Sequence, residues 1–184
     1  QGNYTLDELN ERFDELHGLF PNIISNKVVI GQSVEGRDIW AFKVSDNPNV
    51  DEDEPEVLYT ALTHSREPLG MMNLIYFVQL LAEEQNSNPE FEYLISNREM
   101  WFIPVVNPDG YAYNESIEPT GGGMHRKNRL NTNCGNGSNR GVDLNRNYGF
   151  GWGSNDIGSS PNPCSATYRG CLLYTSPSPR DLST

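Results

Sequence analysis

The chain has 184 residues, of which 36% are hydrophobic and 21% are charged, and its mean hydropathy is -0.61. This length suits a single domain with a real hydrophobic core, and this composition is typical of a soluble globular protein rather than a disordered one. The net charge of -12 and the pI near 4.6 argue against a nucleic-acid partner, because phosphate backbones are bound by clustered Lys and Arg. No apolar stretch approaches the roughly 20 residues of a transmembrane helix, so we expect no membrane span.

The N-terminal region predicts one helix followed by a hairpin. Residues 5–8 read as a capping box, and the apolar residues that follow recur at helical spacing as far as Leu16, so we expect an amphipathic helix that ends before Pro21. Residues 27–32 and 38–45 are rich in Val, Ile, Trp and Phe. A Glu-Gly turn between them predicts a hairpin of two edge strands.

The middle of the chain predicts an alternation of strands and helices. Residues 57–63 are a short apolar run with β-branched and aromatic members, and residues 71–84 form an apolar helical segment. A second helix is expected near residues 89–96. It leads into residues 100–106, whose continuous apolar character suits a strand buried on both faces. This β-α-α-β order predicts an α/β fold.

Two segments carry little periodicity. The acidic run at residues 51–54 predicts a solvated surface loop. Residues 107–170 are dominated by Gly, Asn, Ser and Pro, so we expect long loops there. Loops of that length inside a compact domain are uncommon unless they are functional, so the site is expected in this part of the chain.

His64 and Glu67 form the first candidate site. His64 follows the predicted strand 57–63, and ligands of α/β sheets gather at the carboxyl ends of strands. A turn can bring an imidazole nitrogen and a carboxylate at this spacing onto one metal ion, and nitrogen with oxygen ligands suits Zn²⁺. Taken alone, the His-x-x-Glu spacing favours a helix-capping or surface pair over a metal site.

Three further segments follow this motif in order: Asn107-Pro108-Asp109-Gly110-Tyr111, Arg126-Lys127-Asn128-Arg129 and Gly141-Val142-Asp143-Leu144-Asn145-Arg146-Asn147. Together with His64-Ser65-Arg66-Glu67 they resemble the M14 zinc metallocarboxypeptidases of the carboxypeptidase A and T group. The resemblance runs from about residue 22 to residue 170 with order and approximate spacing kept. It implies an α/β fold with a mixed, mainly parallel twisted sheet and helices on both faces, incomplete at the C-terminus.

The resemblance also implies the metal and its ligands. In that family the first His and the Glu of His-x-x-Glu bind one Zn²⁺ per catalytic domain, so His64 and Glu67 are expected to be metal ligands. A later His is the third ligand, and a later Glu is the general base. We expect both to lie beyond residue 170.

Arg126, Asn145 and Arg146 are the substrate-binding residues that the resemblance implies. Arg126 matches the catalytic arginine that stabilises the developing oxyanion, a task suited to a fixed guanidinium in a water-poor site. Asn145 and Arg146 match the pair that grips the free α-carboxylate of the substrate, where a planar guanidinium can form two parallel hydrogen bonds. The alternatives are a solvated Arg126 in a basic cluster and a purely structural Arg146.

The remaining implied roles are supporting ones. Asp143 matches the aspartate that orients the first zinc-binding imidazole through its other ring nitrogen. Arg66 matches a residue that lines the substrate cleft one subsite further from the scissile bond. Related enzymes often carry a disulfide around the Arg146 loop, which implies a Cys134–Cys164 bridge. Closing a loop of about 30 residues would stabilise the fold by about 3–4 kcal/mol.

Residues 171–184 depart from the family pattern. They resemble translated adaptor sequence, with a genuine Ser/Pro-rich linker as the alternative. We therefore expect residues 1–170 to be the N-terminal part of a zinc carboxypeptidase catalytic domain and residues 171–184 to be a non-native tail. The 184-residue chain alone is expected to be inactive. It does not begin with Met, so we expect it to start inside a longer reading frame or after processing.

The predicted function of the parent protein is a zinc-dependent metallocarboxypeptidase that removes C-terminal amino acids from peptides. We expect it to be secreted or extracellular and monomeric, with peptide or protein C-termini as its substrate. Two alternatives remain open. One is a catalytically dead pseudopeptidase that binds peptides, and the other is a related zinc deacylase or amidase.

Overall fold

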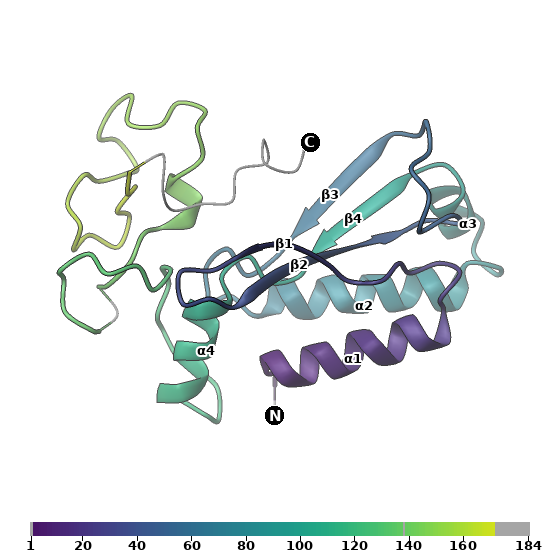
Figure 1. Ribbon diagram of the computed structural model, residues 1–184, viewed down its shortest axis with the longest axis horizontal. Helices are drawn as coiled ribbons and strands as arrows, with labels where there is room; N and C mark the ends of the chain where they lie inside the picture. The colour runs from purple at the N-terminus through teal and green to yellow at the C-terminus, as the bar shows by residue number, and fades with distance from the viewer. Residues whose placement is uncertain (1, 138, 172–184) are drawn as a thin grey trace.

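The structure is a computed structural model that describes residues 2–137 and 139–171. Within these residues the elements follow the chain as α1 (Leu6–Leu19), β1 (Val28–Gln32), β2 (Asp38–Val44), β3 (Glu56–Thr60), α2 (Leu69–Glu84), α3 (Pro89–Ile95), β4 (Glu99–Ile103), α4 (Pro108–Ile117) and the short 3₁₀ helix η1 (Leu144–Arg146). Figure 1 shows a sheet covered by α1 and α2, with α4 and the loops of the second half of the chain beyond one end of it. In this described part, none of the helices has the length and apolar character that crossing a membrane requires.

The four described strands form one mixed sheet in the order β1-β2-β4-β3. β1 with β2 and β2 with β4 are antiparallel pairs, whereas β3 and β4 run parallel. The hairpin is confirmed, but only β1 is an edge strand: β2 lies between β1 and β4, so the prediction of two edge strands was wrong for β2. Its nearly continuous burial fits an inner strand.

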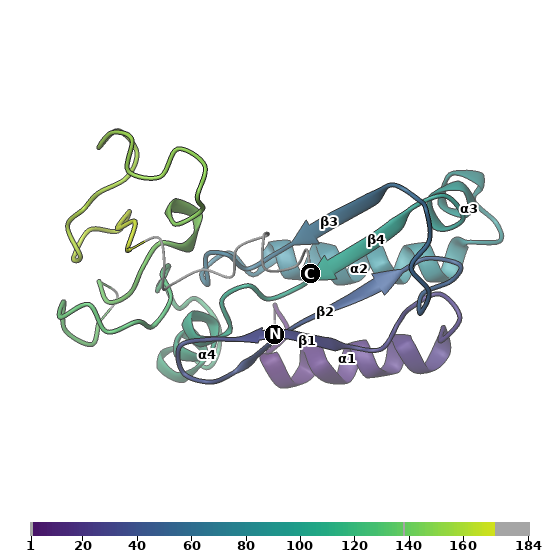
Figure 2. The ribbon, with the colours of Figure 1, turned by 45° about the horizontal axis from the view of Figure 1, so that its top comes forward.

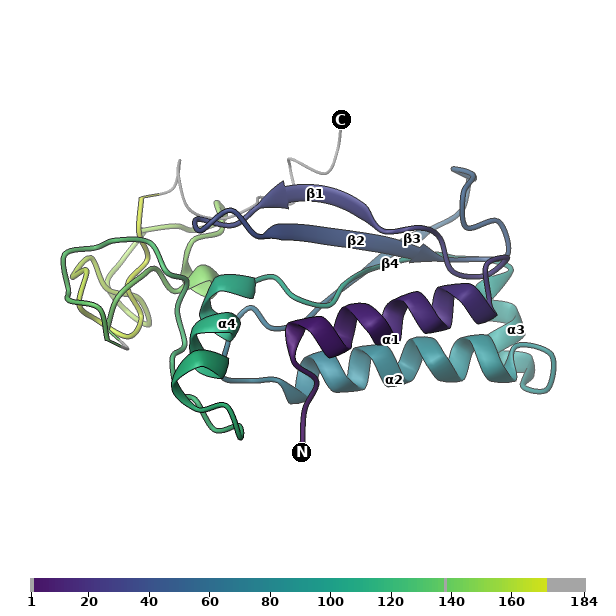
Figure 3. The same cartoon turned by 60° about the horizontal axis from the view of Figure 1, so that its bottom comes forward.

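One face of the sheet packs against α1 and α2, which run side by side beneath it in Figure 3. The capping box of α1 is present, because the Thr5 side chain accepts a hydrogen bond from Glu8 N and the Glu8 side chain accepts one from Thr5 N. The main hydrophobic core lies between these layers, and its aromatic members include Phe13, Phe42 and Phe102. The Phe42 and Phe102 rings are stacked with centroids 5.3 Å apart, which joins the inner strands β2 and β4.

A second, smaller cluster covers the opposite face. Ile39 and Ala41 of β2 and Ile103 of β4 point to this side, where they meet Val106 and Leu144. Because Leu144 belongs to η1, helical segments contact both faces of the sheet. The mixed α/β fold is therefore confirmed, although the described strands form one parallel and two antiparallel pairs rather than a parallel majority.

Long loops dominate residues 107–170 as expected, but α4 among them was not predicted from the sequence. Asn107 caps this helix by accepting a hydrogen bond from Gly110 N, and Pro108 occupies its first turn. The buried face of α4 includes Asp109, Gly110 and Asn114. Since that face is largely polar, hydrophobic periodicity could not reveal the helix.

The two-part organisation of the chain stays a prediction. Of the expected non-native tail, only Cys171 is described, and it is exposed. Residues 172–184 lie outside the described residues.

Candidate active site

The carboxyl ends of β3 and β4 lead into the region where the predicted site residues gather. Figure 2 shows both arrowheads pointing toward α4 and the green and yellow loops. Beyond β3 the chain stays paired with the end of β4 and the residues that follow it, because Ala61 N donates to Ile103 O and Val106 N donates to Ala61 O. Leu62 then adopts φ of 50°, a conformation that is rare outside glycine. The chain turns there and directs His64 into the loop region.

His64 is buried and held at both ring nitrogens. Nδ1 lies 3.0 Å from Oε2 of Glu67, and Nε2 lies 3.1 Å from Oδ1 of Asp143. Asp143 is fully buried, whereas the Glu67 side chain is 57% exposed. The Nδ1 side of the imidazole therefore faces an accessible carboxylate, and the Nε2 side faces an inaccessible one.

Arg126 joins the same network from another loop. Its Nε and Nη2 atoms donate to Oδ2 of Asp143 at 3.2 and 3.0 Å, and its Nη1 lies 3.6 Å from Oε1 of Glu67. The loop is fixed because Asn128 N donates to Val142 O, and Val142 N donates to Oδ1 of Asn128. This pairing aligns Arg126 with Asp143.

Asp143 is the electrostatic centre of this arrangement. Burial by itself would raise the pKa of Asp143, but hydrogen bonds from His64 and Arg126, and the charge of Arg126, outweigh burial and hold it below its usual range. The carboxylate therefore stays ionised. It fixes the imidazole and the guanidinium on the same support.

The donor set fits two positions of a catalytic zinc site. A catalytic Zn²⁺ takes three protein ligands of the His, Asp, Glu or Cys type, and an imidazole whose other nitrogen contacts a carboxylate is the usual arrangement. His64 Nδ1 and the Glu67 carboxylate match that chemistry. Among residues 2–137 and 139–171 there is no group of three or more such side chains suited to hold a metal ion.

The other predicted site residues lie around this network. Asn145 is exposed, and its backbone N–H donates to Oδ1 of Asp143. Arg146 donates from Nε to Gly158 O at 2.7 Å and from Nη1 to Asn145 O at 2.9 Å. Arg66 is exposed and lines a cavity of about 450 Å³, which is also lined by residues of α4. The structure thus brings His64, Glu67, Arg126 and Asp143 into direct contact, with Asn145 joined through its backbone.

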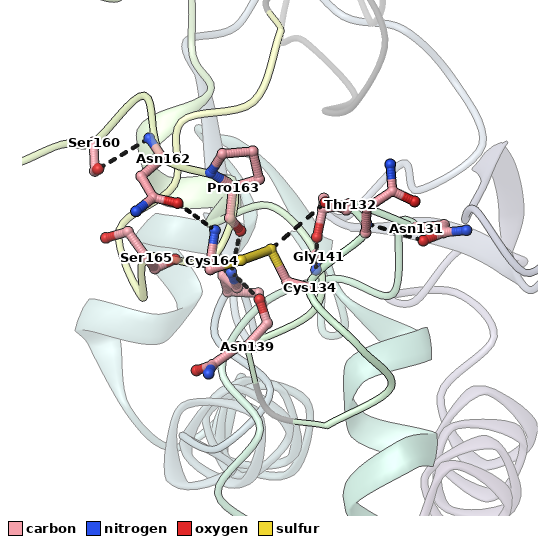
Figure 4. Close-up of a disulfide and its surroundings, with 12 residues drawn as sticks. Asn131, Thr132, Cys134, Asn139, Gly141, Ser160, Asn162, Pro163, Cys164 and Ser165 are labelled. Atoms are coloured by element: carbon pink, nitrogen blue, oxygen red, sulfur yellow. Dashed lines mark hydrogen bonds between the residues drawn. A yellow bond between two sulfur atoms is a disulfide. The ribbon is translucent and has the colours of Figure 1, made fainter.

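The expected disulfide between Cys134 and Cys164 is present. Figure 4 shows it beside Pro163 and Ser165, the two neighbours of Cys164. The buried Lys127 ammonium donates to the carbonyl oxygens of Pro163, Ser165 and Asn139. The residue after Arg126 therefore anchors the loops that the disulfide joins.

Sequence reasoning missed the polar residues that hold these loops, chiefly Lys127 and Asn114. Asn114 bonds to Ser65 and to His125 through its side-chain amide. The available signal was the Asn-Pro start of a helix at residues 107–108. Extending that helix would have placed Asn114 two turns further on the same face as Asn107.

Comparisons with known proteins identify the family of the chain. The Peptidase_M14 zinc carboxypeptidase family matches residues 9–178. A zinc carboxypeptidase of Saccharothrix mutabilis subsp. capreolus is 39% identical over 149 residues, which cover 81% of this chain and 32% of that protein. Carboxypeptidase A1 of Sus scrofa is 34% identical over 170 residues, which cover 91% of this chain and 37% of that protein.

Solved structures of carboxypeptidases are also similar to this chain. The crystal structure of carboxypeptidase A from Helicoverpa armigera is similar with a TM-score of 0.77 and 31% sequence identity, over 95% of this chain and 40% of that one. The chain thus spans about a third of the length of the curated relatives named above. The family resemblance inferred from the sequence is confirmed, and the chain belongs to the zinc carboxypeptidase family.

Proposed function

We propose that the protein containing this chain is a zinc-dependent metallocarboxypeptidase that removes C-terminal amino acids from peptides. The observation that carries the proposal is the double attachment of His64, whose Nδ1 faces Glu67 and whose Nε2 faces the buried Asp143. An imidazole held in this way is oriented for a metal on its Nδ1 side. Membership of the family supports the same assignment.

In this proposal His64 and Glu67 hold the zinc ion, and Asp143 keeps the imidazole in the tautomer with its proton on Nε2. When bound, zinc would polarise the scissile carbonyl and activate a water molecule for attack. A third ligand would come from residues other than those described, because the described residues hold no group of three metal-binding side chains. The general base is assigned to a later Glu, as the family resemblance implies.

Arg126 is assigned to stabilise the negative charge that develops on the carbonyl oxygen. Its ion pair with Asp143 fixes two of the guanidinium nitrogens, so the group is positioned before substrate arrives. Asn145 and Arg146 are assigned to the α-carboxylate of the substrate, and Arg66 to the cleft beyond the scissile bond. Arg146 would have to exchange its contacts with Gly158 and Asn145 for the carboxylate.

The predicted partners and compartment remain part of the proposal. Peptide or protein C-termini are the substrate, and the protein acts as a monomer. Secretion is supported by the Cys134–Cys164 disulfide, since such bonds persist mainly in oxidising compartments.

The metal assignment is tested on the whole protein that contains this chain. Removing zinc with a chelator should abolish hydrolysis of a peptide with a free C-terminus, and adding Zn²⁺ should restore it. His64→Ala and Glu67→Ala should each bind zinc at least tenfold more weakly than the wild type. Asp14→Asn, at an exposed ion pair on α1, is the matched control and should bind zinc normally. Zinc affinity unchanged in both ligand variants would refute the assignment.

The carboxylate assignment needs a different substrate pair. A peptide and its C-terminally amidated form are compared with the wild type and with Arg146→Met, and Arg12→Met on α1 serves as the control. The wild type should strongly prefer the free acid, and Arg146→Met should lose most of that preference. Equal cleavage of both peptides by the wild type would exclude a carboxypeptidase and favour an amidase. Zinc binding without hydrolysis of either peptide would favour the pseudopeptidase or the deacylase, and hydrolysis of an N-acyl amino acid would then distinguish these two.

A further inference from the structure

Asn107, the N-cap of α4, lies in line with Gly110 and Asn114 on one face of the helix. Their spacing of three and then four residues places them one above another on a helix. Two backbone segments lie against this face: residues 63–65, which contain the proposed zinc ligand His64, and residues 125–127, which contain Arg126.

The contact between the helix and these segments is close. A Cβ atom at Gly110 would lie 2.5 Å from Oγ of Ser65 and 2.6 Å from the carbonyl oxygen of Lys127. A Cβ atom at Gly123 would lie 2.6 Å from Cβ of Asn114. There is therefore no room for a side chain at either glycine. Because the packing is this close, a small displacement of α4 must displace the segments that lie against it.

Both the oxygen and the nitrogen of the Asn114 side-chain amide form hydrogen bonds to the two segments. Its Oδ1 accepts from His125 N at 2.8 Å, and its Nδ2 donates to Ser65 O at 3.0 Å and to His125 O at 2.9 Å. The residue is only 4% exposed. The same two segments also bond directly, because Ser65 Oγ donates to His125 O at 2.7 Å and Ser65 N donates to Arg126 O at 3.2 Å.

We propose that Asn114 is a positioning residue, which sets the distance between the proposed zinc ligands His64 and Glu67 and the proposed oxyanion-binding Arg126. Ser65 lies between the two ligands, and His125 immediately precedes Arg126. One buried amide thus fixes both halves of the site to a rigid helix. Errors of about 1 Å in such placements can cost about 100-fold in rate. The catalytic consequence rests on the proposed function, whereas the structural connection does not.

The test compares three variants in the whole protein. Asn114→Leu keeps the approximate size of the side chain but removes all its hydrogen bonds, and Asn114→Ser is a milder change that leaves one hydroxyl. Val78→Ala, in the core between α2 and the sheet, is the control for general loss of stability. Conditions are chosen so that the control and the Asn114 variants lie equally far below their melting temperatures.

Three readouts are taken. The first is hydrogen exchange of the Ser65 N–H, which bonds to Arg126 O and not to Asn114, so it reports whether the two segments separate. The second is the dissociation constant for Zn²⁺, measured by competition with a chromophoric chelator. The third is the separation of kcat from KM for a peptide substrate.

In Asn114→Leu we expect Ser65 N–H exchange at least tenfold faster than in Val78→Ala, zinc affinity about 10–100-fold weaker, and a loss in kcat with KM nearly unchanged. Asn114→Ser should fall between wild type and Asn114→Leu. Exchange and zinc affinity equal to those of the control would overturn the positioning role. Faster exchange in a protein whose wild type neither binds zinc nor cleaves peptides would retain the structural connection and refute the proposed function instead.

Discussion

The fully buried carboxylate of Asp143 lies 3.1 Å from Nε2 of His64. The same carboxylate accepts two hydrogen bonds from Arg126 through its second oxygen. One side chain therefore couples a proposed zinc ligand to the proposed oxyanion-binding group. Any change at Asp143 should affect both.

Asp143→Asn is predicted to weaken the site and the fold together. The amide keeps the shape but loses the negative charge, so the hydrogen bonds from Arg126 are no longer charge-paired. Loss of this outer support should lower zinc affinity about 10–100-fold. Arg126 would keep only the more distant and exposed Glu67 as a charged partner, so the free energy of unfolding should fall by about 3 kcal/mol. Zinc competition and urea unfolding of the whole protein measure the two effects.

The matched control is Asp156→Asn. Asp156 pairs with Arg169 at 2.7 Å, but its side chain is 70% exposed, so its loss should change stability by at most about 1 kcal/mol. Zinc affinity should not change. Equal effects of the two substitutions would show that Asp143 has no special connection to the metal site.

The apolar elements of the fold could be predicted from the sequence, whereas the polar ones could not. α1, α2 and β4 bury hydrophobic side chains, so their periodicity or continuous apolar character identified them. α4 was missed because Asp109, Gly110 and Asn114 occupy its buried face. Asp109 accepts hydrogen bonds from side chains and a backbone N–H of the β1–β2 turn, and Asn114 bonds to backbone groups of distant loops. Single-sequence patterns carry no information on those contacts.

The residues of the candidate site could likewise be predicted only in part. The order of the motifs identified His64, Glu67, Arg126 and Asp143, and the structure brings these four together. The supports of the site come from hydrogen bonds between segments far apart in sequence, such as Lys127 with Pro163. Only the fold reveals these pairs, because Lys and Asn are usually solvent-exposed residues.

Gly141→Ala is predicted to be strongly destabilising. Gly141 has φ of 98°, and a Cβ atom there would lie 1.8 Å from the carbonyl oxygen of Asn128. The segment would have to separate from residues 126–128, so we expect a loss of more than about 3 kcal/mol in the free energy of unfolding. Gly70→Ala is the control. Gly70 lies in α2, and a Cβ atom there would be 3.6 Å from Cβ of Ala61, an ordinary van der Waals contact. That change should be neutral or stabilising by up to about 1 kcal/mol.

Thermal and urea unfolding of both glycine variants decide this point. If Gly141→Ala unfolds like Gly70→Ala, the close approach of residues 128 and 141 does not exist in solution.

Lys127→Met is predicted to loosen the loops that the disulfide joins. The ammonium is buried and donates to three carbonyl oxygens, and hydrogen bonds from charged groups each contribute about 1.5–3 kcal/mol. Burial lowers the pKa of Lys127, and the charge of Asp143 opposes this shift only in part. We expect a net loss of about 3 kcal/mol, since the desolvation cost of the charge is recovered.

A double-mutant cycle tests whether Lys127 and the disulfide act together. Removing the bridge by replacing both cysteines with Ala should cost about 3–4 kcal/mol by itself. Because Pro163 and Ser165 flank Cys164, the combined variant should lose clearly less than the sum of the two single effects. Strict additivity would mean that Lys127 and the bridge stabilise separate regions.

His125 is predicted to make the fold sensitive to acid. Burial lowers the pKa of His125, the hydrogen bond to Asn128 O opposes the shift, and the charges of Arg129 and Lys127 add to it. The unfolded chain therefore binds a proton near pH 6.5, whereas folded His125 binds one only at lower pH. Stability from this residue is fully present above about pH 6.5 and decreases as the pH falls toward the folded pKa, by at most about 1.4 kcal/mol per pH unit.

The measurement is the free energy of unfolding from pH 7.5 to 5.0, in the presence of a chelator so that loss of metal does not contribute. His125→Gln can still donate a hydrogen bond to Asn128 O but cannot take up a proton, so its stability should fall less steeply with acidification than that of the wild type. The imidazole resonances of folded His125 should also titrate at lower pH than those of the unfolded chain. The same slope in both proteins would mean that His125 is protonated in the folded state as readily as in the unfolded chain, and its burial between α4 and residues 128–129 would then be incorrect.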